Sequence, residues 1–153
     1  MRGTEGEALA LEMHVTGTRA GTNQLQDFVW YTGLHRAKEG TWELYHPDKS
    51  GPVLQIDWSR QSATDKDLVF ANVEAGVPAQ GDTLAYSLES PIASMAIHDA
   101  QNDQGVPADF SVTWSFDSGA GKMHRVSGED ACWDTLANGQ VDLPCPNGDW
   151  PLP

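Results

Sequence analysis

The chain of 153 residues has few positive charges. Nine lysine and arginine residues stand against 22 aspartate and glutamate residues, which gives a net charge of −13. No lysine or arginine lies between Lys66 and Lys122, or after Arg125. An acidic surface of this kind repels nucleic-acid phosphates and anionic lipid headgroups. The charge therefore argues against a nucleic-acid or membrane-surface role. It leaves open an attraction for cations or a basic partner, beside the simpler role of keeping the protein soluble.

Long apolar runs are also absent. No stretch approaches the roughly 18 residues that a membrane-spanning helix needs, so we expect no membrane insertion. The segment Met1–Val15 has one arginine ahead of an apolar stretch that Glu7 and Glu12 interrupt, so it lacks the pattern of a signal peptide. Six tryptophans, four phenylalanines and three tyrosines are more than a disordered chain carries. We expect residues 1–153 to form a single folded domain.

Cysteine is scarce, with Cys132 and Cys145 as the two examples. They lie in the segment 128–153, which shows no regular period, and we predict that they form a disulfide that pins this C-terminal segment. Such a bond is worth roughly 3 kcal/mol in the chain-entropy model. Free thiols or metal ligands are the alternatives, but two cysteines with no histidine nearby make a poor zinc site. A disulfide implies an oxidising compartment, so we expect a secreted or periplasmic protein whose signal has been removed.

The segment Ala108–Gly119 is the clearest strand in the sequence. It places Phe110, Val112, Trp114 and Phe116 on one face, and small polar residues alternate with them on the other. This period of two is typical of a half-buried strand. Eight other segments also indicate strands: 8–15, 25–36, 41–46, 53–60, 67–74, 82–89, 92–98 and 122–127.

The sequence therefore predicts an all-β fold with an antiparallel meander of about nine strands. Most connections are too short to hold a crossover helix, so neighbouring strands should pair antiparallel. We expect the meander to close as a small barrel or a two-sheet sandwich, since either arrangement protects the sheet edges. Two segments, Phe28–Tyr31 and Leu68–Val73, are apolar on both faces. They indicate strands that are covered on both sides, inside the fold or at an interface.

The tripeptide Gly40-Thr41-Trp42 matches the short G-x-W motif of lipocalins. This resemblance implies a barrel that carries a small apolar ligand. The alternative, which we favour, is that Gly40 completes a hairpin turn and Trp42 packs in the core. Trp133 and Trp150 lie in irregular segments, where an exposed indole can stack on a sugar ring or cap the end of the fold. We retain Trp133, Trp150 and Trp42 as candidate ligand-binding residues.

One acidic loop is a candidate calcium site. It carries Asp99, Asn102, Asp103 and Asp109, whose oxygen atoms are the ligands that calcium prefers. The spacing does not match an EF-hand loop, and a solvated acidic loop is the simpler interpretation. We expect no other cofactor.

No catalytic motif is recognisable in the sequence. A nucleophile elbow, an H-E-x-x-H helix and a phosphate-binding loop are all missing. His98 and Asp99 are adjacent on a strand, so their side chains should point to opposite faces. The leading hypothesis is a non-catalytic extracytoplasmic β module for protein–protein or surface-structure interaction, with self-association possible. A lipocalin-like carrier and a carbohydrate-binding module are the alternatives, and a hydrolase that uses carboxylates ranks below them.

Overall fold

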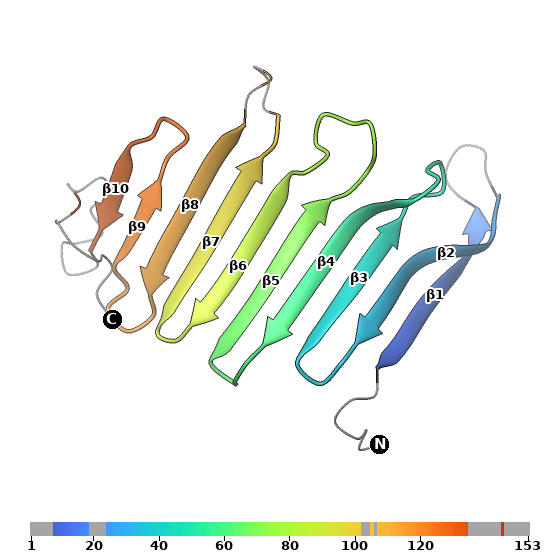
Figure 1. Cartoon of the computed structure of the whole chain (residues 1–153), viewed down its shortest axis with the longest axis horizontal. Coiled ribbons are helices and arrows are strands. Elements are labelled where there is room, and N and C mark those ends of the chain that lie inside the picture. The colour runs from blue at the N-terminus through green and yellow to red at the C-terminus, as the bar shows by residue number, and fades with distance from the viewer. Residues whose placement is uncertain (1–7, 19–23, 102–104, 106, 135–144, 146–153) are drawn as a thin grey trace.

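The structure is a computed structural model, and it describes residues 8–18, 24–101, 105, 107–134 and 145. These residues form ten antiparallel strands in one sheet, in which the order in space is the order in the chain (Figure 1). The all-β antiparallel meander is thus confirmed. Within the described residues, no helix is long and apolar enough to cross a membrane. The strands are β1 (Leu9–Thr18), β2 (Gln24–His35), β3 (Glu39–Tyr45), β4 (Pro52–Arg60), β5 (Asp65–Asn72), β6 (Thr83–Glu89), β7 (Ile92–Asp99), β8 (Ala108–Ser115), β9 (Gly121–His124) and β10 (Asp130–Trp133).

The predicted closure into a barrel or a two-sheet sandwich is wrong for the described chain. The sheet is a single open layer, and β1 and β10 form its two opposite edges (Figure 1). Bending a sheet over on itself needs bulges or kinks. Here the register shifts occur only in the β1–β2 and β3–β4 pairs, and the pairing from β4 to β10 is regular. The short hairpins that the sequence indicates set which strands are neighbours, but they do not make the sheet curl.

The tenth strand lies where we expected irregular structure. β10 occupies only four residues of the segment 128–153, too few to show a period, and it pairs with β9. Its Cys132 forms the predicted disulfide with Cys145, with 5.1 Å between the two Cα atoms. Cys132 is almost completely buried, at 1% exposure. The disulfide therefore ties the edge of the sheet to a residue 13 positions further along the chain.

The alternation in β8 follows the prediction over most of its length. Phe110, Val112 and Trp114 lie on one face, opposite Ile97, Met95 and Ala93 of β7. Phe116 was predicted to extend this row, but β8 ends at Ser115 and Phe116 lies in the following turn with 60% of its surface exposed.

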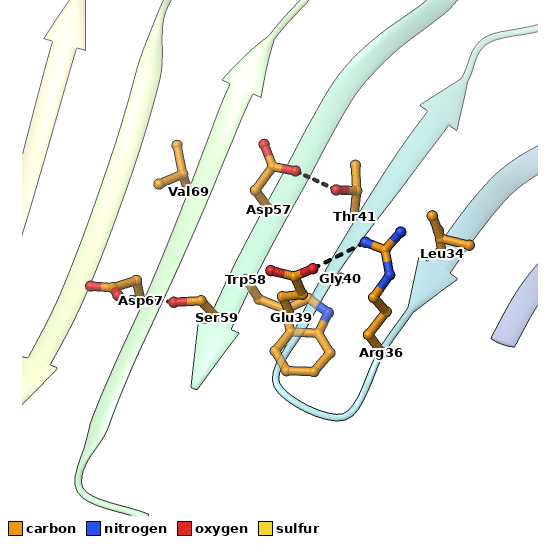
Figure 2. A pocket seen from close by; sticks show the side chains of 10 residues that line it. All are labelled: Leu34, Arg36, Glu39, Gly40, Thr41, Asp57, Trp58, Ser59, Asp67 and Val69. Carbon is orange, nitrogen blue, oxygen red and sulfur yellow. Dashed lines mark hydrogen bonds and ion pairs between the residues drawn. The ribbon is translucent and has the colours of Figure 1, made fainter. Parts of the chain in front are cut away.

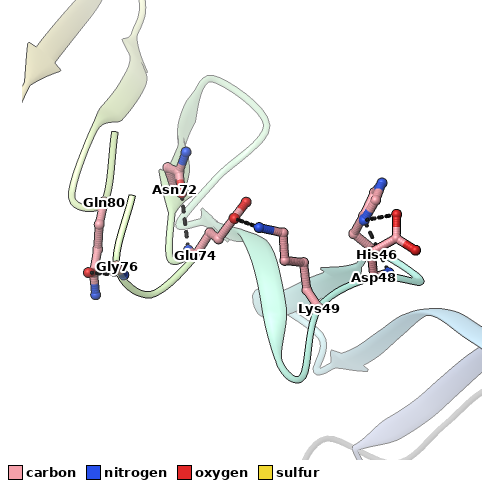
Figure 3. Close-up of polar contacts among 7 residues, drawn as sticks. All are labelled: His46, Asp48, Lys49, Asn72, Glu74, Gly76 and Gln80. Carbon is pink, nitrogen blue, oxygen red and sulfur yellow. Dashed lines mark hydrogen bonds and ion pairs between the residues drawn. The ribbon is translucent and has the colours of Figure 1, made fainter. Parts of the chain in front are cut away.

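Polar contacts fix the loops at one end of the sheet (Figure 3). Lys49, in the β3–β4 loop, forms an ion pair with Glu74, in the β5–β6 loop. The backbone N–H of Glu74 in turn donates to the side-chain oxygen of Asn72, at 3.0 Å. These contacts connect two loops that are separated in sequence by the β4–β5 hairpin.

Candidate interaction surface

One face of the sheet is apolar across its whole width, and we call it the apolar face. In an antiparallel pair, directly opposed residues share a face, so the register traces rows of side chains from strand to strand. One row contains Gly33, Trp42, Ile56, Phe70, Leu84, Ile97 and Phe110. The next row contains His35, Gly40, Trp58, Leu68, Tyr86, Met95, Val112, Met123 and Ala131. Leu9, Leu11 and Met13 extend the apolar face over β1.

Each tryptophan on the apolar face stands opposite a very small residue. Trp42 opposes Gly33, Trp58 opposes Gly40, Trp114 opposes Ala93, and Trp133 opposes Gly121. The indole of Trp42 lies so close to Gly33 that a Cβ atom there would be 2.9 Å from Cε3 of the ring. Added Cβ atoms at Gly40 and Gly121 would also overlap the rings of Trp58 and Trp133. The large rings therefore cover their small neighbours, where a larger side chain would not fit.

An aromatic cluster lies towards the β1 side of this face. The ring of Trp42 contacts Tyr31 and His35 edge to face, with centroid distances of 4.9 Å and 4.5 Å. The ring of His35 also lies 5.6 Å from that of Trp58. Its Nε2 atom is buried with no hydrogen-bond partner. A buried polar atom without a partner costs about 1–3 kcal/mol, which opposes the favourable packing of these rings.

The described chain has almost no hydrophobic core of its own. Its nearly fully buried hydrophobic residues are all small: Ala93, Ala120, Ala131 and Cys132. Leu9, Leu11, Met13, Leu34 and Ile97 are each more than a third exposed. A chain of this length normally buries most of its large apolar side chains. Within the described residues, no second layer covers the apolar face.

The opposite, polar face carries a shallow hollow of about 430 Å³ near the lower ends of β3, β4 and β5 (Figure 2). The hydroxyl of Thr41 donates to Asp57 at 2.6 Å, and that of Ser59 donates to Asp67 at 3.0 Å. Arg36 and Glu39 form an ion pair across the mouth at 3.0 Å. Each of these carboxylates already has a hydrogen-bond or ion-pair partner. They are not arranged as a general acid and a general base on opposite sides of one substrate position, so the hollow gives little support to the hydrolase hypothesis.

Three histidines of the sheet pair with an aspartate on a neighbouring strand. The Nδ1 atoms of His14, His98 and His124 lie 2.6–2.8 Å from carboxylate oxygens of Asp27, Asp109 and Asp130. Hydrogen bonds from Lys122 and then from His124 hold the pKa of Asp130 below its usual value. Desolvation lowers the pKa of His14, but the hydrogen bonds of the ring to Glu12 and Asp27 raise it by more. The net effect is a pKa above the usual value for histidine.

One of these pairs belongs to a row of serine, histidine and aspartate. Ser111 stands opposite His124, which stands opposite Asp130. These residues line an open polar hollow together with Thr113 and Lys122. His124 bonds to Asp130, but among the described residues no hydrogen bond joins the Ser111 hydroxyl to the His124 ring, so nothing activates the serine as a nucleophile. We assign no catalytic role to it.

The predicted ligand-binding tryptophans have different surroundings. Trp42 and Trp133 both lie on the apolar face, and Trp150 falls outside the described residues. The Nε1–H group of Trp133 donates to the carbonyl of Gly119 at 3.0 Å. Gly40, which we expected in a hairpin turn, is instead within β3 beneath Trp58. The open sheet encloses no lumen within the described residues, so the lipocalin resemblance of Gly40 and Trp42 loses its structural basis.

The candidate calcium ligands are not gathered by the structure as far as it describes them. Asp109 pairs with His98 on the polar face, whereas Asp99 lies two residues after Ile97 on the same strand and so shares the apolar face with it. Asp99 accepts a hydrogen bond from the backbone of Gln101 at 3.1 Å. Asn102 and Asp103 lie outside the described residues. Among the described residues, no three histidine, cysteine or acidic side chains are placed to hold a metal ion.

The sequence reasoning missed the breadth of the apolar face. We expected each amphipathic strand to form half of a closed core. The sequence did carry a signal for this face. When alternating strands pair antiparallel in the right register, the apolar residues of all of them fall on the same side of the sheet. Leu68 and Phe70 lie on the apolar face, while Val69 points to the polar face beside Asp57.

In comparisons with known proteins, no protein-family model, no curated protein and no solved structure matches the chain.

Proposed function

We propose that this protein is a non-catalytic interaction module whose apolar face docks onto an apolar surface of a protein partner. The observation that carries the proposal is a continuous apolar face over ten strands with no large hydrophobic side chain nearly fully buried among the described residues. Soluble proteins rarely leave contiguous apolar patches of more than a few hundred Å² exposed, and larger patches mark interaction sites.

The energy available at this face is large. Full burial of one exposed leucine, phenylalanine or methionine side chain contributes about 1.5–3 kcal/mol. Leu9, Leu11, Met13 and Ile97 are each between 38% and 59% exposed. Even partial burial of these and their neighbours would favour association by several kcal/mol. A partner with a matching apolar surface thus supplies the core that the described chain lacks.

The disulfide supports an extracytoplasmic setting for this module. Cys132 and Cys145 are paired, and such bonds persist in oxidising compartments. The acidic composition and the hydrogen-bonded polar face would keep the outer side of such an assembly in water. A role within a surface structure is consistent with both features.

Carbohydrate binding is the second candidate. The half-buried indoles of Trp42 and Trp58 lie over Gly33 and Gly40, and a flat ring can stack on a sugar. Aliphatic side chains outnumber aromatic ones on the apolar face, however, and aliphatic side chains do not stack on sugar rings. This composition favours a protein partner.

Methionine chemistry offers a direct test. Met13, Met95 and Met123 all lie on the apolar face, so photo-methionine incorporated in the producing cells samples this face. We expect irradiation to crosslink these positions to protein. Met95→Lys should reduce the crosslinks made at position 123. Ala96→Lys, which adds the same charge to the other face of β7, should not.

Two results would contradict the proposal. Crosslinks only to glycans would favour the second candidate. Equal protein crosslinking by the Met95→Lys and Ala96→Lys variants would show that the apolar face is not the docking surface.

A further inference from the structure

We infer that the partner of the apolar face is a second copy of this chain, packed face to face around a two-fold axis that runs across the strands. This inference rests on the proposed function, and it names the partner and the orientation. The result would be a two-layer β sandwich in which each copy supplies one sheet. Such an interface is isologous and closes on itself.

The area of the face is what a stable dimer needs. Ten strands at a spacing of about 4.8 Å span roughly 43 Å, and seven residues along a strand span roughly 24 Å. The apolar face therefore offers about 1,000 Å² to a partner, whereas a standard stable interface buries about 800 Å² on each side. Stacked sheets lie about 10 Å apart, and the glycines leave room for the tryptophan rings within each sheet.

The negative charge of the chain does not oppose this dimer. Several carboxylates belong to the polar face, among them Glu43, Asp57, Asp67, Asp109 and Asp130. They would therefore point away from the second copy. The two rows described above cross the middle of the strands, and they contain no aspartate or glutamate. Two copies can thus meet without burying a carboxylate in the centre of the interface.

The two margins of the apolar face carry opposite charges, which sets the orientation. At one end, Arg60 and Lys66 stand directly opposite each other, and neither forms an ion pair within the described chain. Like charges in such a pair repel. At the other end, Asp82 and Asp99 line a hollow of about 390 Å³ together with Leu54, Phe70 and Asn72.

A two-fold axis across the strands brings these margins together. It reverses the strand direction of one copy and places the basic end of each sheet against the acidic end of the other. Lys66 of β5 would then face the region of Asp82 in the second copy, since Asp82 directly precedes β6. The two residues would be offset sideways by about one strand spacing. An axis along the strands would instead stack basic on basic and acidic on acidic. Charge complementarity therefore favours the first arrangement.

Sedimentation velocity of the whole chain tests the association. We expect the wild-type protein to sediment with twice the mass of the chain at tens of micromolar. Met95→Lys should shift it to the monomer, because the lysine would stand between Tyr86 and Val112 in the interface. Ala96→Lys is the matched control and should remain dimeric. A wild-type monomer at about 100 μM would overturn the inference.

A spin-label distance tests the orientation without touching the interface. Ala63 lies in the exposed β4–β5 loop, so an Ala63→Cys label leaves both faces intact. With the axis across the strands, the two labels should lie on the order of 45 Å apart, since each is about seven residues from the middle of its strand. An axis along the strands would bring them within roughly 15 Å and would contradict the proposed orientation.

The binding of an apolar dye separates failure of this inference from failure of the proposed function. A monomer that binds anilinonaphthalene sulfonate strongly, and loses that binding with Met95→Lys but not with Ala96→Lys, would overturn the dimer and retain an open docking face. A monomer that binds no dye would overturn both, because its apolar face would be covered by its own chain.

Discussion

The ring of Trp42 lies over Gly33 on the neighbouring strand, where a Cβ atom would be 2.9 Å from Cε3 of the indole. The pairing is repeated at Trp58 and Trp133, each opposite a glycine. Glycine weakens a strand by removing a side chain and by its backbone entropy. Its recurrence opposite tryptophan indicates that these positions serve the shape of the apolar face.

Replacing this glycine should therefore destabilise the protein. Gly33→Ala forces the Trp42 ring to move, and we expect the free energy of unfolding to fall by about 1–3 kcal/mol. Gly17→Ala in β1 is the control, since nothing lies within 4 Å of an added Cβ there. Urea unfolding at one fixed protein concentration gives both values. Equal stabilities for the two variants would show that the indole does not rest on Gly33.

The disulfide should contribute measurably to stability. It closes a loop with a sequence separation of 13 residues, for which the chain-entropy model gives about 3 kcal/mol. Reduction should lower the melting temperature, and the oxidised protein unfolded in guanidinium should release no thiol to Ellman reagent. One or two free thiols in that assay would contradict the pairing of Cys132 with Cys145.

The pH dependence of His14 follows from its two carboxylate neighbours. Glu12 and Asp27 raise the folded-state pKa of His14 above its unfolded value near 6.5. Its contribution to stability is therefore fully present below about pH 6.5, and it is lost as the pH rises through the folded pKa. Asp27→Asn should lower the pKa of His14 in an NMR titration. Asparagine suits the positive φ of 51° at this position.

The distant substitution Asp117→Asn is the control for that titration. Asp117 follows β8, while His14 lies on β1 at the other side of the sheet. An unchanged pKa of His14 in the Asp27→Asn variant would contradict the contact between the two side chains.

Local structure could be predicted from the sequence because it depends on local patterns. The alternation of Phe110, Val112 and Trp114 indicated the face of β8, and the segment Val53–Arg60 matched β4 within one residue. The ends of β1 and β5 were less well placed, since the pattern weakens where strands enter loops. β10 was missed because its four residues include only one clear apolar repeat, Ala131 and Trp133.

The open form of the sheet could not be predicted in the same way. Closure depends on curvature and on what lies across the apolar face, and neither is written in the period of a single strand. The segment Phe28–Tyr31 was misleading for a physical reason. A register shift follows the Met13–Tyr31 pair, and Trp30 is left 47% exposed. The apolar residues on both faces of this segment therefore mark a β-bulge, and they are not buried on both faces.

The most direct measurement of whether the apolar face is covered uses the methyl groups of Met13, Met95 and Met123, which all lie on it. Methyl NMR with a soluble gadolinium chelate reports how far each methyl is from solvent. In the whole wild-type chain, Met95 and Met123 should be protected from relaxation, and Met123 should lose this protection in the Met95→Lys variant but keep it with Ala96→Lys. Fast relaxation of both methyls in the wild-type chain at every concentration would contradict a covered apolar face.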